Sequence, residues 1–316
     1  MSAAEVWLLV GAGLIGLLVA GALSPLEALG WWAGWLGELE PDDAAAKGAS
    51  APEAAQHYVV FLGGIDSVSG ESYAPREKKF LERLRTDLAE DRLIEVFPYS
   101  VTSRALTGQR LLARLWRWLL AKKLQGNTAG FLINLRNVWQ VLVSADRRYG
   151  PLYNEGTAEL MLHALKRHGY LWESGTPVTL IGYSGGGQIA CGAAGLLKDL
   201  LNAPVQVISL GGVISSDSGL TRIDHLYHLY GEHDGVQRLG ERVFPGRWSL
   251  FPNSSWNRAL NQGRITRVPM GSVKHSGAGG YLDDEAFYPE GDSYAQKTLQ
   301  VITGIVRDEA RGENEG

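Results

Sequence analysis

The chain has few of the residues that hold small or metal-dependent folds together. Its 316 residues contain one cysteine, Cys191, so no disulfide can form within the chain. No cysteine and histidine cluster has the spacing of a zinc site, and we expect no metal. Basic residues are not in excess: 30 Lys and Arg against 34 Asp and Glu give a net charge of −4, which does not favour nucleic-acid binding. Hydrophobic residues make up 45% of the chain, enough for a sizeable core.

Charge is absent from one long segment near the N-terminus. The 21 residues from Val6 to Leu26 carry no charged side chain. As a helix they would span roughly 31 Å, about the thickness of a bilayer core. Residues 26–39 contain Trp31, Trp32 and Trp35, and Trp side chains prefer the membrane interface. We therefore expect residues 1–40 to form a transmembrane helix followed by an interfacial segment, and we expect the protein at a membrane. Too few Lys and Arg flank the span to predict which side the domain faces.

Two other interpretations of this segment remain open. Ala20-Gly21-Ala22 fits a signal-peptidase site, although no Lys or Arg precedes the apolar run. The run Gly11-Ala12-Gly13-Leu14-Ile15-Gly16 matches the G-x-G-x-x-G pattern of dinucleotide-binding folds. That pattern also requires a second strand ending in an acidic residue about 20 residues later, and none follows.

The rest of the chain predicts a linker and one folded domain. Residues 41–56 are rich in Ala, Pro and acidic residues and have no apolar period, which is typical of a flexible linker. Residues 57–316 then alternate short apolar runs with helical patterns. The expected strands are 57–62, 93–97, 178–182, 205–210, 225–230 and 265–268. The expected helices are 75–90, 105–124, 130–146, 156–168 and 293–309, with another that follows the glycine-rich turn after 182 and runs to about 201. Strands separated by helices predict an α/β fold, with a mostly parallel central sheet and helices on both faces.

One motif in this domain carries chemistry. Gly182-Tyr183-Ser184-Gly185-Gly186 has the pattern G-x-S-x-G, directly after the expected strand at 178–182 and before an apolar helix. A serine on such a sharp strand-to-helix turn needs small flanking residues, and the turn presents its hydroxyl at the open end of the sheet. The setting indicates that Ser184 is a nucleophile.

A nucleophilic serine needs a base, and the base needs an orienting acid. Where such a turn carries the serine, the acid and then the histidine follow it along the chain. His275 lies in a loop directly after the last expected strand, and we predict that it is the base. Asp234 lies in a glycine-containing loop after the strand at 225–230, and we predict that it is the acid. His233 remains open as an alternative base, and Glu232 and Asp217 remain open as alternative acids.

The reaction also needs backbone donors for the negative charge that develops on the substrate oxygen. The amide of Gly185, directly after the nucleophile, is one candidate. The second should come from the loop after the first core strand, where Gly63-Gly64 lets the backbone turn inward, and we choose Ile65.

With these residues in place, residues 57–310 resemble an α/β-hydrolase. The resemblance implies a serine hydrolase that cleaves an ester, thioester or amide without a metal or organic cofactor. Together with the N-terminal segment, it leads us to expect a membrane-anchored enzyme that acts on an acyl ester, either a small molecule or a lipid. A peptidase or amidase, or an inactive hydrolase fold used for binding, remains open.

The segment at about 103–149 is an insertion of unusual charge. It holds nine basic residues against one acidic residue, Asp146, and Trp116, Trp118 and Trp139 lie among them. One interpretation is a helical lid, or a surface that faces anionic lipid headgroups. The other is a packed helix with a solvated basic face. Nucleic-acid binding is not expected.

Overall fold

The computed structural model of the chain describes residues 55–67, 72–88, 92–99, 118–119, 121–122 and 131–312. The anchor expected at 1–40 lies outside the described residues, as does the linker expected at 41–56 except for its end. Within the described ranges, no helix is both long enough and apolar enough to cross a bilayer.

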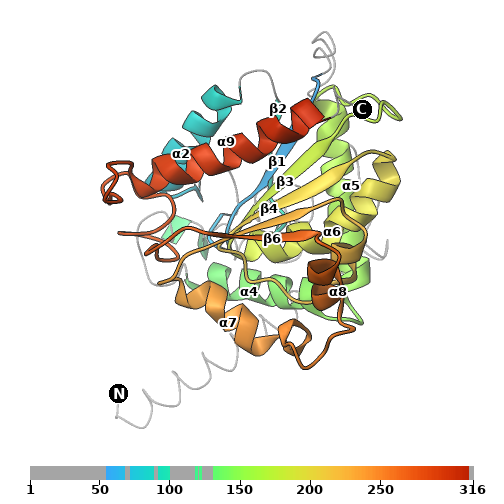
Figure 1. The fold of residues 1–316 in the computed structure, drawn as a ribbon. Helices are drawn as coiled ribbons and strands as arrows, with labels where there is room; N and C mark the ends of the chain where they lie inside the picture. The colour runs from blue at the N-terminus through green and yellow to red at the C-terminus, as the bar shows by residue number, and fades with distance from the viewer. Residues whose placement is uncertain are drawn as a thin grey trace.

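One sheet of parallel strands organises the described part of the chain (Figure 1). The strands lie in the order β2-β1-β3-β4-β5-β6. Their bounds are β1 (Tyr58–Leu62), β2 (Arg92–Val96), β3 (Val178–Tyr183), β4 (Val205–Leu210), β5 (Leu226–Tyr230) and β6 (Ile265–Pro269). Every strand pair is parallel, and Leu62 at the end of β1 pairs with Gly182 near the end of β3. The carboxyl ends of all six strands therefore meet at one edge, where ligands bind in open α/β sheets.

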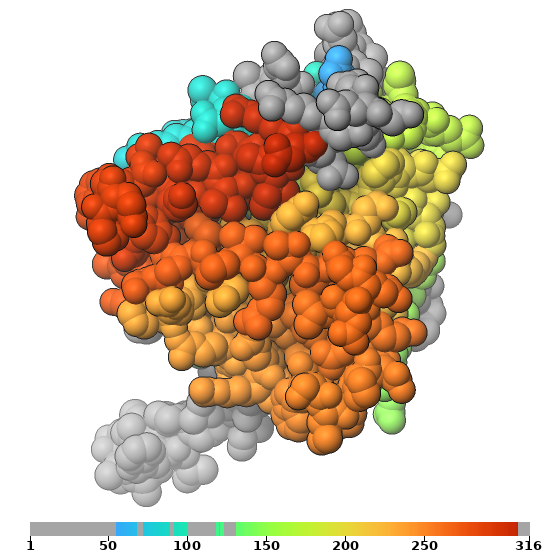
Figure 2. Space-filling view, in the orientation of Figure 1, coloured from blue at the N-terminus to red at the C-terminus, as the bar shows by residue number. Residues whose placement is uncertain are grey.

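Helices cover both faces of this sheet (Figure 1). One face carries α2 (Pro75–Asp87) and α9 (Tyr294–Gly312), and Figure 2 shows α9 at the outer surface of the molecule. The opposite face carries the remaining longer helices: α4 (Phe131–Ala145), α5 (Gly150–Arg167) and α6 (Gly185–Leu201). Short elements follow β4, β5 and α7: η4 (Ser218–Thr221), α7 (Gly235–Val243), η5 (Pro245–Arg247) and α8 (Ser255–Asn261). This parallel sheet with helices on both sides fits the α/β-hydrolase fold.

The sequence explains why the sheet is covered on both faces. Every residue of β1, β3 and β4 is buried, and these strands are accordingly mostly apolar rather than alternating between apolar and polar. Alternate residues of β1 then enter two separate cores. Val60 packs with the helices α5 and α6, whereas Val59 and Phe61 pack with α2 and α9.

The strands and the long helices lie where the sequence predicts them, with differences at some ends. Helix α5 begins at Gly150, six residues before the expected start, because Pro151 occupies the first turn, where its fixed backbone angle suits a helix. Helices α7 and α8 are not predicted. Both are short, and α7 turns its apolar side chains away from the core, so no core-facing period marks it.

The described part of the insertion packs against the domain. Helix α4 contacts α6 and α5. Its only basic residue, Arg136, is buried rather than solvated, and the guanidinium donates to the carbonyl of Tyr99 over 2.7 Å. Arg136 is therefore not part of a basic surface that faces lipid headgroups. Most of the helix expected at 105–124 lies outside the described residues, and the four that are described are helical.

The close approach of α5 and α6 generates a prediction about stability. A Cβ at Gly192 on α6 would lie 2.4 Å from the Asn154 side-chain nitrogen. Asn154 is buried and hydrogen-bonded to Ser144, so it cannot move aside. We expect Gly192→Ala to lower the free energy of unfolding by about 1–3 kcal/mol through overpacking.

The matched control is Gly304→Ala on α9, where a Cβ would meet nothing within 4 Å. This substitution should raise the free energy of unfolding by roughly 0.5–1 kcal/mol, because alanine restricts the unfolded chain more than glycine does. Urea denaturation of both variants measures the two effects. Equal effects of the two substitutions would contradict the packing of α5 on α6.

Candidate active site

Ser184 occupies a strained turn between β3 and α6. Its backbone has φ 53° and ψ −121°, a conformation that few residues other than glycine adopt. The turn is tight on both sides. A Cβ at Gly182 would lie 2.6 Å from the Gly186 carbonyl oxygen, and one at Gly186 would lie 2.3 Å from the Leu62 carbonyl oxygen. Glycine is therefore required at both positions, which explains the motif that the sequence contains.

His275 lies beside this serine. Its Nε2 is 2.8 Å from the Ser184 Oγ. The loop that carries the imidazole is tied to the end of β3, because the Tyr183 hydroxyl donates to the His275 carbonyl over 2.8 Å and the two rings stack. The structure thus brings together two residues that lie 91 positions apart in the sequence.

Asp234 lies on the other side of the imidazole. Its two carboxylate oxygens are 3.0 and 2.9 Å from His275 Nδ1. The carboxylate is fully buried and accepts two further hydrogen bonds, from the Gln237 amide over 2.9 Å and from the Tyr281 hydroxyl over 2.8 Å. Burial alone would raise the pKa of Asp234. The hydrogen bond and charge of His275, together with the donors at Gln237 and Tyr281, lower it below its usual value.

This geometry determines what the three side chains can do. An ionised Asp234 accepts hydrogen bonds only, so His275 Nδ1 must carry a hydrogen and donate it. Nε2 of a neutral imidazole is then free to accept the hydrogen of the Ser184 hydroxyl. The arrangement can therefore remove a proton from the serine as its oxygen attacks a carbonyl carbon, and the buried carboxylate can stabilise the imidazolium that results.

The two predicted oxyanion donors also come together. A Cβ at Gly185 would lie 2.9 Å from the Ile65 Cγ2, and one at Gly64 would lie 3.5 Å from the Ser184 Cβ. The loop after β1 therefore lies against the nucleophile turn. Asn137 on α4 holds this loop by donating to the Ile65 carbonyl over 2.6 Å. In the hydrogen bonds that the described residues make among themselves, neither the Gly185 nor the Ile65 amide is used.

The alternatives for acid and base lie elsewhere. Asp217 begins η4, where it accepts from the Gly219 amide, and burial raises its pKa to about 6. Glu232 and His233 are exposed, and the hydrogen bonds of the His275 ring among the described residues go to Asp234 and Ser184 instead. Cys191 is buried in the core, as expected from its place on the helix after the nucleophile.

Sequence reasoning missed the donors around the acid. Gln237 lies three residues after Asp234, which is the spacing of a helix N-cap, so the start of α7 could have been recognised from it. Tyr281 is 47 residues from Asp234, and no local pattern marks it. In the described part of the chain, no three His, Cys, Asp or Glu side chains form a set of metal ligands.

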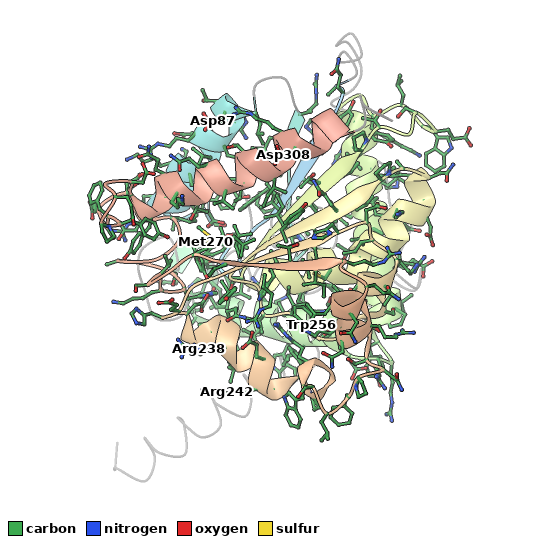
Figure 3. The ribbon with its side chains drawn as sticks, viewed as in Figure 1. Asp87, Arg238, Arg242, Trp256, Met270 and Asp308 are labelled. Carbon is green, nitrogen blue, oxygen red and sulfur yellow. The ribbon has the colours of Figure 1, made fainter. Side chains whose placement is uncertain are left out.

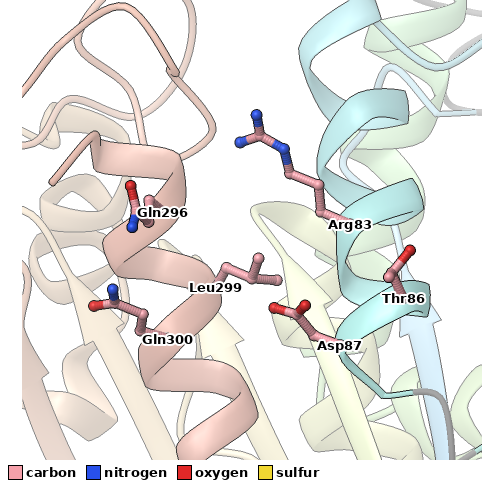
Figure 4. A pocket seen from close by; sticks show the side chains of 6 residues that line it. All are labelled: Arg83, Thr86, Asp87, Gln296, Leu299 and Gln300. Carbon is pink, nitrogen blue, oxygen red and sulfur yellow. The ribbon is translucent and has the colours of Figure 1, made fainter.

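A groove lies between α2 and α9, with a volume of about 470 Å³ (Figure 4). It is lined by Arg83, Thr86, Asp87, Gln296, Leu299 and Gln300. None of these residues belongs to the cluster around Ser184, so we assign the groove no part in the chemistry.

Comparison with known proteins adds little to this site. No family model and no curated protein matches the chain. Among solved structures, the dienelactone hydrolase of Anabaena variabilis ATCC 29413 is 17% identical, with 80% of this chain and 86% of that one covered and a TM-score of 0.40. A protein described as a cell surface hydrolase of Lactobacillus plantarum WCFS1 is 12% identical, with 84% and 98% covered and a TM-score of 0.35. The strand order of this chain and the turn at Ser184 fit the α/β-hydrolase fold by themselves.

The donors around Asp234 generate a prediction about pH. In Tyr281→Phe the carboxylate loses one donor, and the Gly231 amide loses its acceptor, the Tyr281 hydroxyl. We expect the free energy of unfolding to fall by about 1–3 kcal/mol near neutral pH. A lowered pKa gives stability that is present above the unfolded value near 3.8 and is lost as pH falls through the folded value. The deficit of the variant should therefore shrink below about pH 3.8.

The control is Tyr288→Phe, which removes a hydroxyl that donates to the Met270 carbonyl rather than to a carboxylate. Its deficit should not change with pH over the same range. Urea denaturation at several pH values measures both variants. A deficit of Tyr281→Phe that stays constant with pH would contradict an ionised Asp234.

Proposed function

We propose that the protein is a serine hydrolase that cleaves an acyl ester through an acyl-enzyme intermediate. The single observation that supports this most is the unbroken series of short contacts from Asp234 through His275 to Ser184, between 2.8 and 3.0 Å. Serine is a weak nucleophile without a base, and this arrangement supplies one.

The proposed reaction has two halves. In the first, Ser184 Oγ attacks the ester carbonyl carbon while its proton passes to His275 Nε2. The tetrahedral intermediate collapses, the bond to the alcohol breaks, and the alcohol leaves with the proton from His275. In the second half, a water gives its proton to His275 and attacks the acyl-serine ester. Collapse then releases the carboxylic acid, and the proton returns to Ser184. Asp234 stays ionised throughout and stabilises the imidazolium.

In both halves a negative charge develops on the carbonyl oxygen. The amides of Gly185 and Ile65 are the proposed donors to it. Gly185 is also the first residue of α6, where the helix dipole favours negative charge. These donors need not move during the reaction, since the loop after β1 is held by Asn137.

The proposed enzyme acts at a membrane. The uncharged span at residues 6–26 would anchor the chain, and an enzyme held at a bilayer has acyl lipids within reach. A small soluble ester, a peptide and an amide are the alternative substrates, and hydrolysis rates on each class distinguish them.

A fluorophosphonate probe tests the proposed nucleophile. We expect the probe to label the wild-type chain at Ser184, and Ser184→Ala to abolish both labelling and ester hydrolysis. His275→Ala should lower kcat by about as much as the serine substitution, because the three residues act as a unit. Asp234→Asn should lower kcat by roughly 10⁴-fold, because it upsets the tautomer of His275.

The controls are His233→Ala and Asp217→Asn, which should keep wild-type turnover. Hydrolysis rates on short-chain esters, long-chain esters, anilides and peptides identify the bond that is cleaved. Full labelling of Ser184→Ala would remove Ser184 as the nucleophile. A wild-type chain that neither reacts with the probe nor turns over any of these substrates would favour a binding protein.

A further inference from the structure

The apolar residues of helix α7 face away from the core of the domain. Val236, Leu239 and Val243 lie on one face, and 42%, 55% and 53% of their respective surfaces are exposed. The residues that α7 turns inward are Gln237 and Gly240. A surface helix normally buries its apolar face against the core. Here that face is presented outward instead, so the core does not explain it.

Further exposed apolar residues follow α7 in the chain, and the Trp248 indole nitrogen donates to the Glu241 carbonyl over 3.0 Å. Trp248, Leu250 and Phe251 are exposed over 43%, 76% and 45% of their surfaces, and the two aromatic rings contact each other. We call these residues the α7 surface: Val236, Leu239, Val243, Trp248, Leu250 and Phe251. Single exposed apolar residues are common, but a group of them on one helix face and in the segment directly after it is typical of an interaction site.

Two exposed arginines lie beside the α7 surface. Arg238 and Arg242 lie one turn apart on α7, on its side away from the sheet (Figure 3). Both are exposed, and neither forms an ion pair with another described residue. The nearby acid Glu241 does not neutralise them, since it pairs with Arg247 and Arg267. Glu232, just before the helix, is exposed as well.

We propose that the α7 surface docks on the headgroup region of an anionic lipid bilayer. A short helix with an outward apolar face and flanking arginines, followed by exposed Trp, Leu and Phe, has the composition of an interfacial element. The arginines complement the negative charge of anionic headgroups. A surface that binds an apolar peptide would not require these arginines. Since α7 begins directly after Asp234, docking would place the proposed active site next to the lipid. That consequence, though not the docking, rests on the proposed function.

The test uses a single reporter in the full chain. Because the only native cysteine is buried, Leu250→Cys creates one accessible thiol for an environment-sensitive fluorophore. The labelled chain is reconstituted in vesicles of phosphatidylcholine, with or without phosphatidylglycerol. With the anionic lipid, we expect a blue shift and quenching by brominated acyl chains. Arg238→Glu with Arg242→Glu should lower the equilibrium constant for insertion by about 30-fold or more.

The matched control is Arg147→Glu with Arg148→Glu, two exposed arginines of the insertion that lie outside the α7 surface. This control should insert like the wild type, and both charge variants should turn over a short soluble ester at the wild-type rate. A fluorophore that stays in water with anionic vesicles would overturn the proposal. So would a fluorophore that is already shielded without lipid, because another segment or a second copy would then cover the surface. Insertion without ester hydrolysis would contradict only the proposed function.

A second observation independently concerns the reaction itself. Tyr99 is fully buried, yet its hydroxyl has no hydrogen-bond partner among the described residues. An unpaired buried hydroxyl is unfavourable, and most buried tyrosines avoid it. Tyr153, for example, donates to the Pro98 carbonyl over 2.8 Å.

The unpaired hydroxyl is directed at the nucleophile turn. It lies 2.8 Å from the position that a Cβ at Gly185 would occupy, next to the Ile65 side chain. Two consecutive residues of α4 hold the surroundings: Arg136 donates to the Tyr99 carbonyl over 2.7 Å, and Asn137 donates to the Ile65 carbonyl over 2.6 Å. Burial, helped by Tyr153 and by nearby carboxylates, raises the pKa of Tyr99, so the hydroxyl keeps its hydrogen.

We infer that the Tyr99 hydroxyl is a third donor to the charged oxygen of the tetrahedral intermediate, beside the amides of Gly185 and Ile65. The inference rests on the proposed function. It explains why the hydroxyl is left unpaired in the free protein: its partner arrives with the substrate. Donors fixed in place before the reaction stabilise this charge without reorganising.

Tyr99→Phe tests this inference. The substitution removes the hydroxyl alone, and we expect kcat on an ester to fall by about 10- to 1,000-fold with little change in KM. Inhibition by a boronic acid, whose tetrahedral serine adduct carries a charged oxygen, should weaken by a similar factor. The thermal midpoint should not fall, because no hydrogen bond of the free protein is lost.

Tyr153→Phe is the matched control, since it loses a buried hydrogen bond away from the turn. Tyr153→Phe should lower the thermal midpoint and leave the affinity for the boronic acid unchanged. Wild-type kcat and boronate affinity in Tyr99→Phe would overturn the inference. A wild-type chain without Ser184-dependent turnover would instead contradict the proposed function.

Discussion

The buried carboxylate of Asp234 is the constraint on which the rest of the site depends. A carboxylate without solvent is stable only if hydrogen bonds satisfy its oxygens. The donors here come from three separate places in the chain: Gln237 at the start of α7, His275 after β6, and Tyr281 beyond it. Each of these contacts fixes the position of one loop, so the same bonds that keep the acid ionised also place the imidazole.

Parallel strands bring these loops to one edge. Ser184 follows β3, Asp234 follows β5 and His275 follows β6, and all these strands point the same way. The nucleophile turn then depends on close backbone packing, because Gly186 lies against the carbonyl of Leu62 at the end of β1. The sheet therefore sets the distances between the three side chains, and α4 supports the loop that carries Ile65.

The sequence predicts those parts of the site that a local residue pattern marks. The turn at Ser184 has a local pattern, because backbone strain there demands glycine, and the order of acid and base along the chain then leads to Asp234 and His275. Tyr281 has no such pattern, since it acts through a contact between distant segments. Helix α7 escapes prediction because its apolar residues face outward. The burial of Arg136 is not predicted, because arginine side chains usually lie in solvent. Here the hydrogen bond to the Tyr99 carbonyl holds the side chain in the interior.

The most direct test of the central claim is to trap the acyl-enzyme. The full chain would be mixed rapidly with a p-nitrophenyl ester, quenched in acid and digested, and the acylated peptide would be identified by mass spectrometry. The account predicts a burst of p-nitrophenol stoichiometric with the chain, and an acyl group on the Ser184 hydroxyl. Ester turnover with no acylated peptide, or with the acyl group on another residue, would contradict it.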